Sequence, residues 1–289
     1  MVTSYNAKDF ARNAFKIMVD IDKSELKKDD FNFDLSIHTD VSFVLSSLIE
    51  DKIDYRADDK WINSCQNIRK KYPIIDKEKT KECNYINSYL FIDELARQLS
   101  TDASIVTDMG LSFVGTHQSF KIKMGQNLFT NSGHAPMGWG LPAAFGSCIA
   151  DKSKPVICLT GDGGLMMNIQ EFATIMHHKP NLKIFIYNNG GYLTIKQTQQ
   201  LGFDSRLMGC DEKDLSFPNF ELIAKAHLLP YLRITRKDNL ENDINKILNI
   251  HGPSICELIM DPEQPQVPKH INRKDKNGKA IMSKFEELY

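Results

Sequence analysis

The chain has 289 residues, 42% of them hydrophobic, which is enough for one large domain or two ordinary ones with a real core. Its 36 basic and 37 acidic side chains nearly cancel, so no field of one sign is available to hold nucleic acid or a membrane surface. The six cysteines lack close paired spacing, and no segment reaches the roughly 18 apolar residues of a membrane span. These features predict a cytoplasmic protein with reduced thiols and argue against nucleic-acid and membrane partners.

Residues 1–50 have the pattern of an incomplete α/β domain. A β-branched run at 15–22 predicts a buried strand, and residues 41–49 repeat apolar side chains at helical spacing. The segment between them is polar and is predicted to be irregular. Because one strand and one helix cannot bury their own apolar faces, we expect residues 1–50 to be the remnant of a domain whose other elements lie outside this sequence.

Residues 51–82 are rich in Lys, Asp and Asn, and they predict an inter-domain linker with a surface helix. From residue 83 to about 261, strands alternate with helices in the manner of an α/β fold with a doubly wound parallel sheet. The clearest predicted strands are 156–160, 183–187 and 254–259, and the predicted helices are 87–99, 142–150, 169–177, 219–226 and 239–248. Residues 262–289 form a polar tail in which Pro262, Pro265 and Pro268 are expected to break regular structure.

The segment 156–164 reads as a strand, a glycine turn from Gly161 to Gly164, and then a helix that begins near Asn168. In parallel α/β sheets, ligands bind at the carboxyl ends of the strands, where glycines let backbone N–H groups approach a phosphate. Asp162 would then lie beside that phosphate, which is electrostatically unfavourable. A divalent cation between the carboxylate and the phosphate oxygens would remove the conflict.

The next predicted strand ends in the sequence Asn188-Asn189-Gly190-Gly191. An amide oxygen and a free backbone carbonyl at this point would be hard ligands beside Asp162, and Mg²⁺ takes six such oxygens in octahedral geometry. A Gly-Asp-Gly sequence by itself is common in turns and is more often structural. The prediction therefore depends on its combination with the Asn-Asn sequence at the end of the next strand.

This combination resembles the cofactor fingerprint of thiamine diphosphate enzymes. The segments 137–146 (MGWGLPAAFG), 161–174 (GDGGLMMNIQEFAT) and 261–265 (DPEQP) are similar to the acetolactate synthase branch, whose members are transferases or lyases of branched-chain amino acid biosynthesis. The resemblance covers most of the chain, from about residue 15 to 268. It implies that residues 83–261 bind thiamine diphosphate and Mg²⁺ and that residues 1–50 are the end of the family's middle domain.

Carried over by position, the resemblance gives Mg²⁺ two side-chain ligands, Asp162 and Asn189, and the backbone carbonyl of Gly191. The diphosphate would accept hydrogen bonds from the N–H groups of Gly163 and Gly164, in the turn that starts at Gly161. Weaker candidates for the same role lie at the end of the first strand of this domain, namely Gly110, Leu111 and Ser112. The last two depart from the Gln-His that is usual in the family. Met137 would hold the cofactor in its bent shape, and the Ala135 carbonyl would accept from the aminopyrimidine amine.

Four further residues are candidates for substrate contact. His134 lies near the Met137 segment, although a histidine with a purely structural role is the competing interpretation. The segment 190–200 covers the active site in the family, which makes Tyr192, Lys196 and Gln197 candidates. The competing interpretation is that these three side chains belong only to the surface of a lid and do not contact substrate. The pair His177-His178 is not a metal site by our interpretation, because adjacent helical residues point about 100° apart, and a helix C-terminus explains it.

The resemblance implies decarboxylation of a small 2-oxo acid followed by carboligation. The family activates its cofactor with a glutamate of a separate pyrimidine-binding domain, and no glutamate of this sequence can be assigned that role. We therefore expect an enzyme that is incomplete as a single chain, with that domain or subunit as a partner in a homo- or hetero-oligomer. The alternatives are a relative acting on a modified sugar or another oxo acid, and a non-catalytic cofactor-binding or oligomerising module or gene fragment.

Flavin is a further expectation that the resemblance allows but does not favour. In flavin-binding members, the segments that resemble residues 19–22 and 39–40 contact FAD, which makes Asp20 and Asp40 candidate contacts. Most of such a pocket would lie outside this sequence, and several relatives have lost flavin altogether.

Overall fold

The computed structural model describes residues 10–28, 32–75, 84–266, 272–274, 276 and 280–282. Contacts between residues divide the chain into two units, one of Ile74–Val267 and one that combines Met1–Pro73 with Pro268–Tyr289. Among the helices of the described ranges, none is long and apolar enough to cross a membrane.

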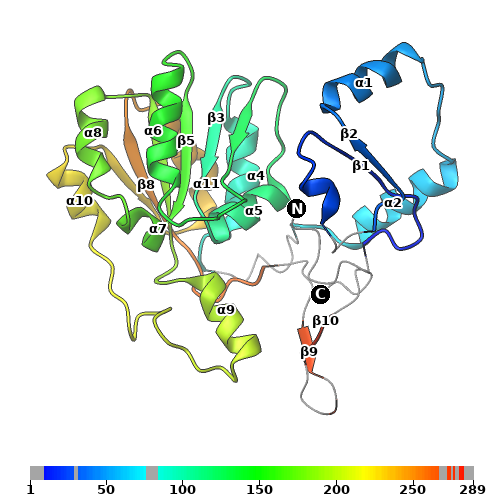
Figure 1. Ribbon diagram of the computed structural model, residues 1–289. Helices are drawn as coiled ribbons and strands as arrows, with labels where there is room; N and C mark the ends of the chain where they lie inside the picture. Colours follow the sequence, from blue (N-terminus) through cyan, green and yellow to red (C-terminus); the bar gives the residue numbers. More distant parts are fainter. Residues whose placement is uncertain are drawn as a thin grey trace. The chain divides into compact units, whose positions relative to one another are not determined.

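The unit of Ile74–Val267 is built on a six-stranded sheet in the order β4-β3-β5-β6-β8-β7 (Figure 1). Every pair of neighbouring strands is parallel, so all strands end at the same edge of the sheet. The strands are β3 (Ser104–Thr107), β4 (Asn127–Phe129), β5 (Val156–Gly161), β6 (Leu182–Asn188), β7 (Tyr231–Ile234) and β8 (Ser254–Ile259). The doubly wound parallel sheet predicted from the sequence is confirmed.

Helices cover both faces of this sheet, and each face has its own hydrophobic core (Figure 1). Alternate residues of β5 belong to different cores, Ile157 and Leu159 to one and Val156 and Cys158 to the other, as the period of a strand requires. The first core contains α4 (Ser88–Gln98), α5 (Leu111–Ser119) and α11 (Leu240–Leu248), and the second contains α6 (Gly140–Ala150), α8 (Glu171–His178) and α10 (Phe220–Ala226). Burial on both faces explains why the strands are continuous apolar runs in the sequence.

Two short helices lie beyond the carboxyl ends of the strands, namely α7 (Asp162–Met166) and α9 (Leu193–Gly202), and the short helix η3 (Lys237–Asn239) precedes α11. The glycine turn predicted between β5 and a helix near Asn168 is therefore wrong in detail. The helix starts directly at Asp162, and α8 follows from Glu171. No pattern in the sequence predicted β4, β7, α5 or α9.

In the other unit, β1 (Ile17–Asp20) pairs in parallel with β2 (Leu35–His38), and α1 (Val41–Glu50) follows. A strand and a helix are present where they were predicted, but β1 is not buried as expected, since Ile17 is 57% exposed. The segment between them is not irregular either, because it contains β2 and the short helix η2 (Glu25–Lys27). The predicted surface helix is α2 (Asp59–Lys71). The C-terminal segment is also not devoid of regular structure, since β9 (Asn272–Lys274) and β10 (Ala280–Met282) form an antiparallel pair.

The two α-helices in the described part of this unit, α1 and α2, have side-chain caps at their N-termini, because Asp40 accepts from the Ser42 N–H and Asp58 accepts from the Lys60 N–H. Neither α1 nor α2 has a buried residue in the described part of the unit. The apolar side chain of Phe43 in α1 is 69% exposed. Local capping thus defines these helices, whereas the described residues supply no core for them.

Candidate cofactor and metal site

A pocket lies where the strands of the large sheet end, and five segments line it. They are the turn after β3, the loop before α6, the junction of β5 with α7, the end of β6 with the loop after it, and the first turn of α9. This is the edge at which parallel α/β sheets bind ligands. The pocket residues are Met109, Gly110, Leu111, Ser112, Met137, Gly161, Asp162, Gly163, Gly164, Tyr187, Asn189, Gly191, Tyr192, Leu193, Thr194 and Ile195.

All but one of the residues predicted to bind the cofactor or the metal therefore lie around one pocket. Ala135 is the exception, since it is not among the lining residues. Its φ of +53° is unusual for a residue with a side chain, and its N–H donates to the Asn131 carbonyl at 2.9 Å. The tight turn at Ala135 leads into the segment that carries Met137.

Asp162 is 2% exposed and accepts hydrogen bonds from backbone N–H groups on two segments. Its Oδ1 accepts from Gly163 at 2.7 Å, and its Oδ2 accepts from Asn189, Gly190 and Gly191 at 3.2, 2.9 and 3.2 Å. Burial raises the pKa of Asp162 to about 6, and these hydrogen bonds partly offset the effect of burial. The carboxylate thus joins the start of α7 to the loop after β6.

The last residue of β6 and the loop after it have two further attachments. The Asn188 side-chain amide donates to Oε1 of Glu257 on β8 at 2.6 Å, and Glu257 is itself 2% exposed. On the other side, the Tyr192 N–H donates to the Cys210 carbonyl at 2.9 Å, and a Cβ on Gly191 would overlap that carbonyl oxygen. These contacts fix the backbone at Asn189 and Gly191, two of the three predicted metal ligands.

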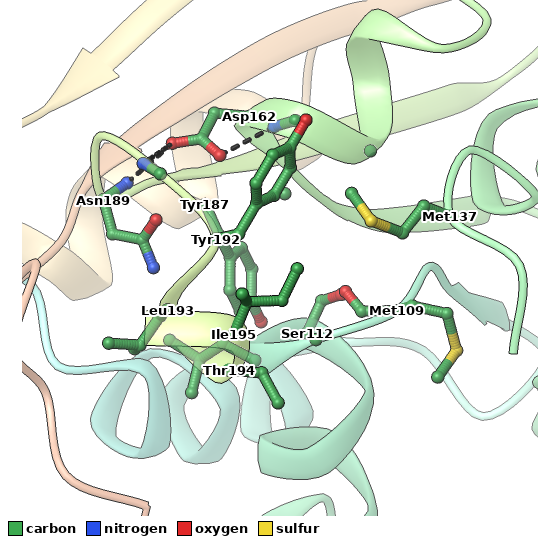
Figure 2. Close-up of a pocket in the computed structure, with 16 residues that line it drawn as sticks. Met109, Ser112, Met137, Asp162, Tyr187, Asn189, Tyr192, Leu193, Thr194 and Ile195 are labelled. Carbon is green, nitrogen blue, oxygen red and sulfur yellow. Dashed lines mark hydrogen bonds between the residues drawn. The ribbon is translucent and has the colours of Figure 1, made fainter. Parts of the chain in front are cut away.

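The aromatic ring of Tyr192 lies directly against Gly163, because a Cβ added to this glycine would overlap Cε1 of the ring. Figure 2 shows Asp162 and Asn189 at one end of the pocket and Met137 at the other, with the rings of Tyr187 and Tyr192 between them. Tyr192 also packs edge-on against Phe217 at a centroid distance of 6.3 Å. Of the four predicted substrate contacts, only Tyr192 lines the pocket.

The other three candidates have different surroundings. Lys196 forms an ion pair with Glu263, and its side chain is 12% exposed. The Gln197 side chain donates to the Gln264 carbonyl at 2.9 Å, so α9 is attached to residues 261–266 at this point. His134 is exposed and lies outside the pocket lining. Their contact with substrate stays a prediction.

Several other predicted positions also have structural partners. Asp20 accepts from the Asp22 N–H at 2.7 Å, and Asp40 caps α1, so each flavin candidate has a local backbone partner. His178 is the last residue of α8 and packs against Phe145 at a centroid distance of 5.4 Å. The position of the His177-His178 pair at a helix C-terminus is confirmed.

Sequence reasoning missed two kinds of residue at this site. Tyr187 in the last part of β6 lines the pocket although it reads as ordinary strand core in the sequence. Asp108 does not line it, but it is 1% exposed and holds three of the surrounding segments together. Its signal in the sequence is an acidic residue directly after the apolar strand β3, the same pattern that identified Asp162 after β5.

The family model of the thiamine pyrophosphate enzyme C-terminal TPP binding domain matches residues 108–258. The acetolactate synthase large subunit of Cyanidium caldarium is 31% identical over 258 residues, which cover 87% of this chain and 43% of that protein. The acetolactate synthase isozyme 1 large subunit of Escherichia coli (strain K12) is 30% identical over 265 residues, which cover 90% of this chain and 45% of that protein. The acetolactate synthase large subunit of Lactococcus lactis subsp. lactis (strain IL1403) is 28% identical over 287 residues, which cover 98% of this chain and 48% of that protein.

Because the family model covers more than half of the chain, the chain belongs to the thiamine pyrophosphate enzymes. Within that class, its sequence is similar to acetolactate synthase large subunits along most of its length. It spans less than half the length of these relatives. The resemblance stated from the sequence is confirmed.

Proposed function

We propose that the chain is the diphosphate- and Mg²⁺-binding part of an enzyme that decarboxylates a 2-oxo acid and joins the product to a second carbonyl compound. The observation that carries this proposal is the convergence of Asp162, Asn189, the Gly163–Gly164 turn and Met137 on one pocket. They come from three different segments of the sequence, 137–146, 161–174 and 188–191, and together they supply metal ligands, phosphate donors and an apolar support.

The chemistry of the donor set fits a hard divalent cation. One carboxylate, one side-chain amide and one backbone carbonyl are oxygen ligands of the kind that Mg²⁺ binds, leaving coordination positions for phosphate oxygens and water. Asp162 would supply the charge, Asn189 the amide and Gly191 the carbonyl. The N–H groups that surround Asp162 compete for the same lone pairs, so a bound cation has to replace part of this hydrogen bonding.

The glycines fit the approach of a phosphate. The N-cap of α5 is Gly110, which has a φ of +81°. Because this residue has no side chain to cap the helix, it leaves the first N–H groups of α5 for a phosphate. Gly163 lies in the first turn of α7, and a side chain there would meet Tyr192. We infer that the Tyr192 ring has to leave this position when a diphosphate reaches Gly163.

Met137 at the opposite end of the pocket (Figure 2) and Leu111 elsewhere in its lining supply apolar surface, which would orient an aromatic ring system and exclude water from it. Thiamine diphosphate, when bound, supplies an acceptor for the electron pair that a 2-oxo acid releases as it loses CO₂. The contribution of this chain would be binding, orientation and the exclusion of competing water.

We further propose that a pyrimidine-binding domain from elsewhere completes the site and supplies the activating glutamate. In this proposal, residues 83–261 form the cofactor domain, residues 1–50 the end of a middle domain, residues 51–82 the linker and residues 262–289 the tail. Two observations support an additional partner: the relatives are about twice as long, and α1 and α2 lack buried residues in their described unit. The oligomer and the cytoplasmic location stay predictions.

The first experiment is calorimetric titration of thiamine diphosphate into the chain with and without Mg²⁺, comparing the native sequence with Asn189→Ala. We expect binding that requires the metal and weakens at least about tenfold in the variant, because one of its ligands is removed. Asn189 is the better site for this test than Asp162, whose carboxylate also holds the loop. Equal binding with and without Mg²⁺ by both proteins would contradict the metal assignment.

The second experiment mixes the chain with a pyrimidine-domain protein of the same family and measures CO₂ release and carboligation with pyruvate and with other 2-oxo acids. Activity that requires both proteins would support a divided enzyme, and the oxo acid with the highest kcat/KM would define the substrate. A chain that binds the cofactor but gains no activity with any such protein would favour the non-catalytic module.

A further inference from the structure

Asp108 is a buried carboxylate that the proposed function does not use. It follows β3, is 1% exposed and does not belong to the pocket lining. Burial raises its pKa, and hydrogen bonds from Thr160 and from backbone N–H groups, Met109 first among them, partly offset this. A buried carboxylate is costly unless its oxygens have donors, so the arrangement of those donors is informative.

The donors come from three segments that meet behind the pocket. The Thr160 hydroxyl at the end of β5 donates to Oδ2 at 2.8 Å, and the Met109 N–H donates to Oδ1 at 2.8 Å. The Gly138 N–H donates to both oxygens, at 2.9 and 3.1 Å. One side chain thus ties the turn after β3 and the end of β5 to the loop before α6.

Two glycines, Gly140 and Gly164, make room for this carboxylate, and a third, Gly138, makes room for Met167. A Cβ on Gly140 would lie 2.8 Å from Cβ of Asp108, and a Cβ on Gly164 would overlap Oδ2 and lie 3.1 Å from Cγ. Gly138 has a φ of +83°, and a Cβ there would lie 2.7 Å from Cβ of Met167. Gly140 of the 137–146 segment and Gly164 of the 161–174 segment are therefore required by the packing around Asp108, independently of any phosphate.

Gly138 is held from its other side as well, because the Asn168 side-chain amide donates to its carbonyl at 2.6 Å. Met137, the preceding residue, lines the pocket opposite Asp162 (Figure 2). Any displacement of Gly138 displaces Met137 relative to the Gly163–Gly164 turn. The position of the apolar support thus depends on a carboxylate that does not touch the pocket.

We propose that Asp108 is a positioning residue, which holds the Met137–Gly138 segment in register with the Gly163–Gly164 turn and so sets the shape of the cofactor pocket. This inference rests on the proposed function for the nature of the ligand, since Met137 is expected to support thiamine diphosphate. Precise support of binding residues by such buried partners is what holds a site in its productive geometry.

The test compares four full-length chains: native, Asp108→Ala, Asp108→Asn and the core control Ile105→Val on the same strand. The first readout, in the absence of cofactor, is amide hydrogen exchange of Gly138 and Met109. The second is the calorimetric Kd for thiamine diphosphate with Mg²⁺, measured on the chain alone or, if that does not bind, on its mixture with a pyrimidine-domain protein.

We expect Asp108→Ala to lose most of the exchange protection at Gly138 and to bind thiamine diphosphate roughly 10- to 100-fold more weakly, as when an outer-shell partner of a site is removed. Asp108→Asn should restore part of both, because its amide oxygen still accepts from Gly138 and its N–H can donate to the Thr160 hydroxyl. Ile105→Val should lower thermal stability and leave the Kd unchanged, since Ile105 is buried away from the pocket.

The outcomes separate the two proposals. Native affinity in Asp108→Ala, or unchanged protection of Gly138, would overturn the positioning role. If Asp108→Ala does not fold, Asp108→Asn and Thr160→Val decide, and native affinity in both would overturn it. A native chain that binds no thiamine diphosphate under either condition would contradict the proposed function, while the exchange of Gly138 would still decide whether Asp108 holds that segment.

Discussion

At the carboxyl end of the large sheet, Asp108 and Asp162 are 1% and 2% exposed, whereas at the amino end Lys183 is 1% exposed. The acidic pair accepts from backbone N–H groups and one hydroxyl. Lys183, the second residue of β6, donates instead to the carbonyls of Ile250 and Gly252, the latter at 2.6 Å. The same sheet therefore buries opposite charges at its two ends, each stabilised by backbone groups of the matching polarity.

The difference follows from the direction of the chain. In a parallel α/β unit, helices begin near the carboxyl ends of the strands and end near the amino ends, so free N–H groups gather at one edge and free carbonyls at the other. An anion or a cation–phosphate pair is stabilised at the first edge and a lysine at the second. The location of the pocket at the carboxyl edge therefore follows from the topology of the sheet, and the residues of the sequence motifs give that edge its particular lining.

The amino end gives the largest expected effect. Burial lowers the pKa of Lys183 to about 8, so between pH 8 and its ordinary value of 10.5 the folded chain has released a proton that the unfolded chain still holds. Lys183 alone should therefore add up to roughly 3 kcal/mol to the stability as pH rises across this window. Cys148, Cys158 and Cys256 act in the opposite direction, because burial raises their pKa values, so the contribution of Lys183 is the difference between the native chain and a variant without it. Urea unfolding of the native chain and Lys183→Met at several pH values measures it. A variant that keeps the native slope would show that Lys183 is not the source.

At the carboxyl end, stability should depend on pH with the opposite sign and in a lower pH range. Since the pKa of Asp162 is raised from 3.8 to about 6, the folded chain keeps a proton between these values that the unfolded chain has lost. Stability of the metal-free chain should fall as pH rises across this window, by up to about 3 kcal/mol. Urea unfolding in the presence of a chelator would check this.

Asp162→Asn should flatten most of this slope, and Asp108→Asn should flatten part of it because burial raises that pKa too. A native chain whose stability instead increases from pH 4 to 6 would break the comparison. The two ends would then not differ in the sign of their pH dependence.

The packing of the acidic end provides a third prediction, Gly164→Ala. The added Cβ would overlap the Asp108 carboxylate and approach the Thr160 hydroxyl to 3.3 Å, and both groups are buried and hydrogen-bonded to each other. We expect a loss of about 1–3 kcal/mol in the free energy of unfolding, as for other overpacked sites. Denaturant unfolding measures it, and a loss below about 0.5 kcal/mol would mean that Asp108 can move without cost.

Much of this end could be read from the sequence. Asp162 and residues 188–191 were predicted to lie together because parallel strands bring their carboxyl ends to one edge, and the apolar runs of β5 and β6 locate those ends. The resemblance to thiamine diphosphate enzymes then singled out Asn189 and Gly191 as metal ligands, which stays a prediction. The polar segment that contains β2 was misjudged, since its Leu35 is 44% exposed and no apolar period marks a strand there.

Other contacts have no local signal in the sequence. Lys196 was a substrate candidate because it follows the predicted metal ligands Asn189 and Gly191, but its ion pair with Glu263 joins residues far apart in the chain. The role of Asp108 was likewise hidden, because its donors at 138 and 160 become neighbours only when the sheet forms. Contacts between segments distant in sequence are what pattern reasoning on one chain misses.

The smallest expected effect comes from Gly146→Ala, the matched control for Gly164→Ala. Gly146 lies in the interior of α6, which runs between the two ends of the sheet, and an added Cβ would meet nothing within 4 Å. A glycine inside a helix costs roughly 0.5–1 kcal/mol relative to alanine, so this variant should be stabilised by about that amount. The same urea experiment measures both variants. Changes of opposite sign in the free energy of unfolding would show that position 164 needs glycine because of its contact with Asp108. Destabilisation of equal size in both variants would mean that an added methyl group is unfavourable at either position, so that the contact with Asp108 would not explain the effect at Gly164.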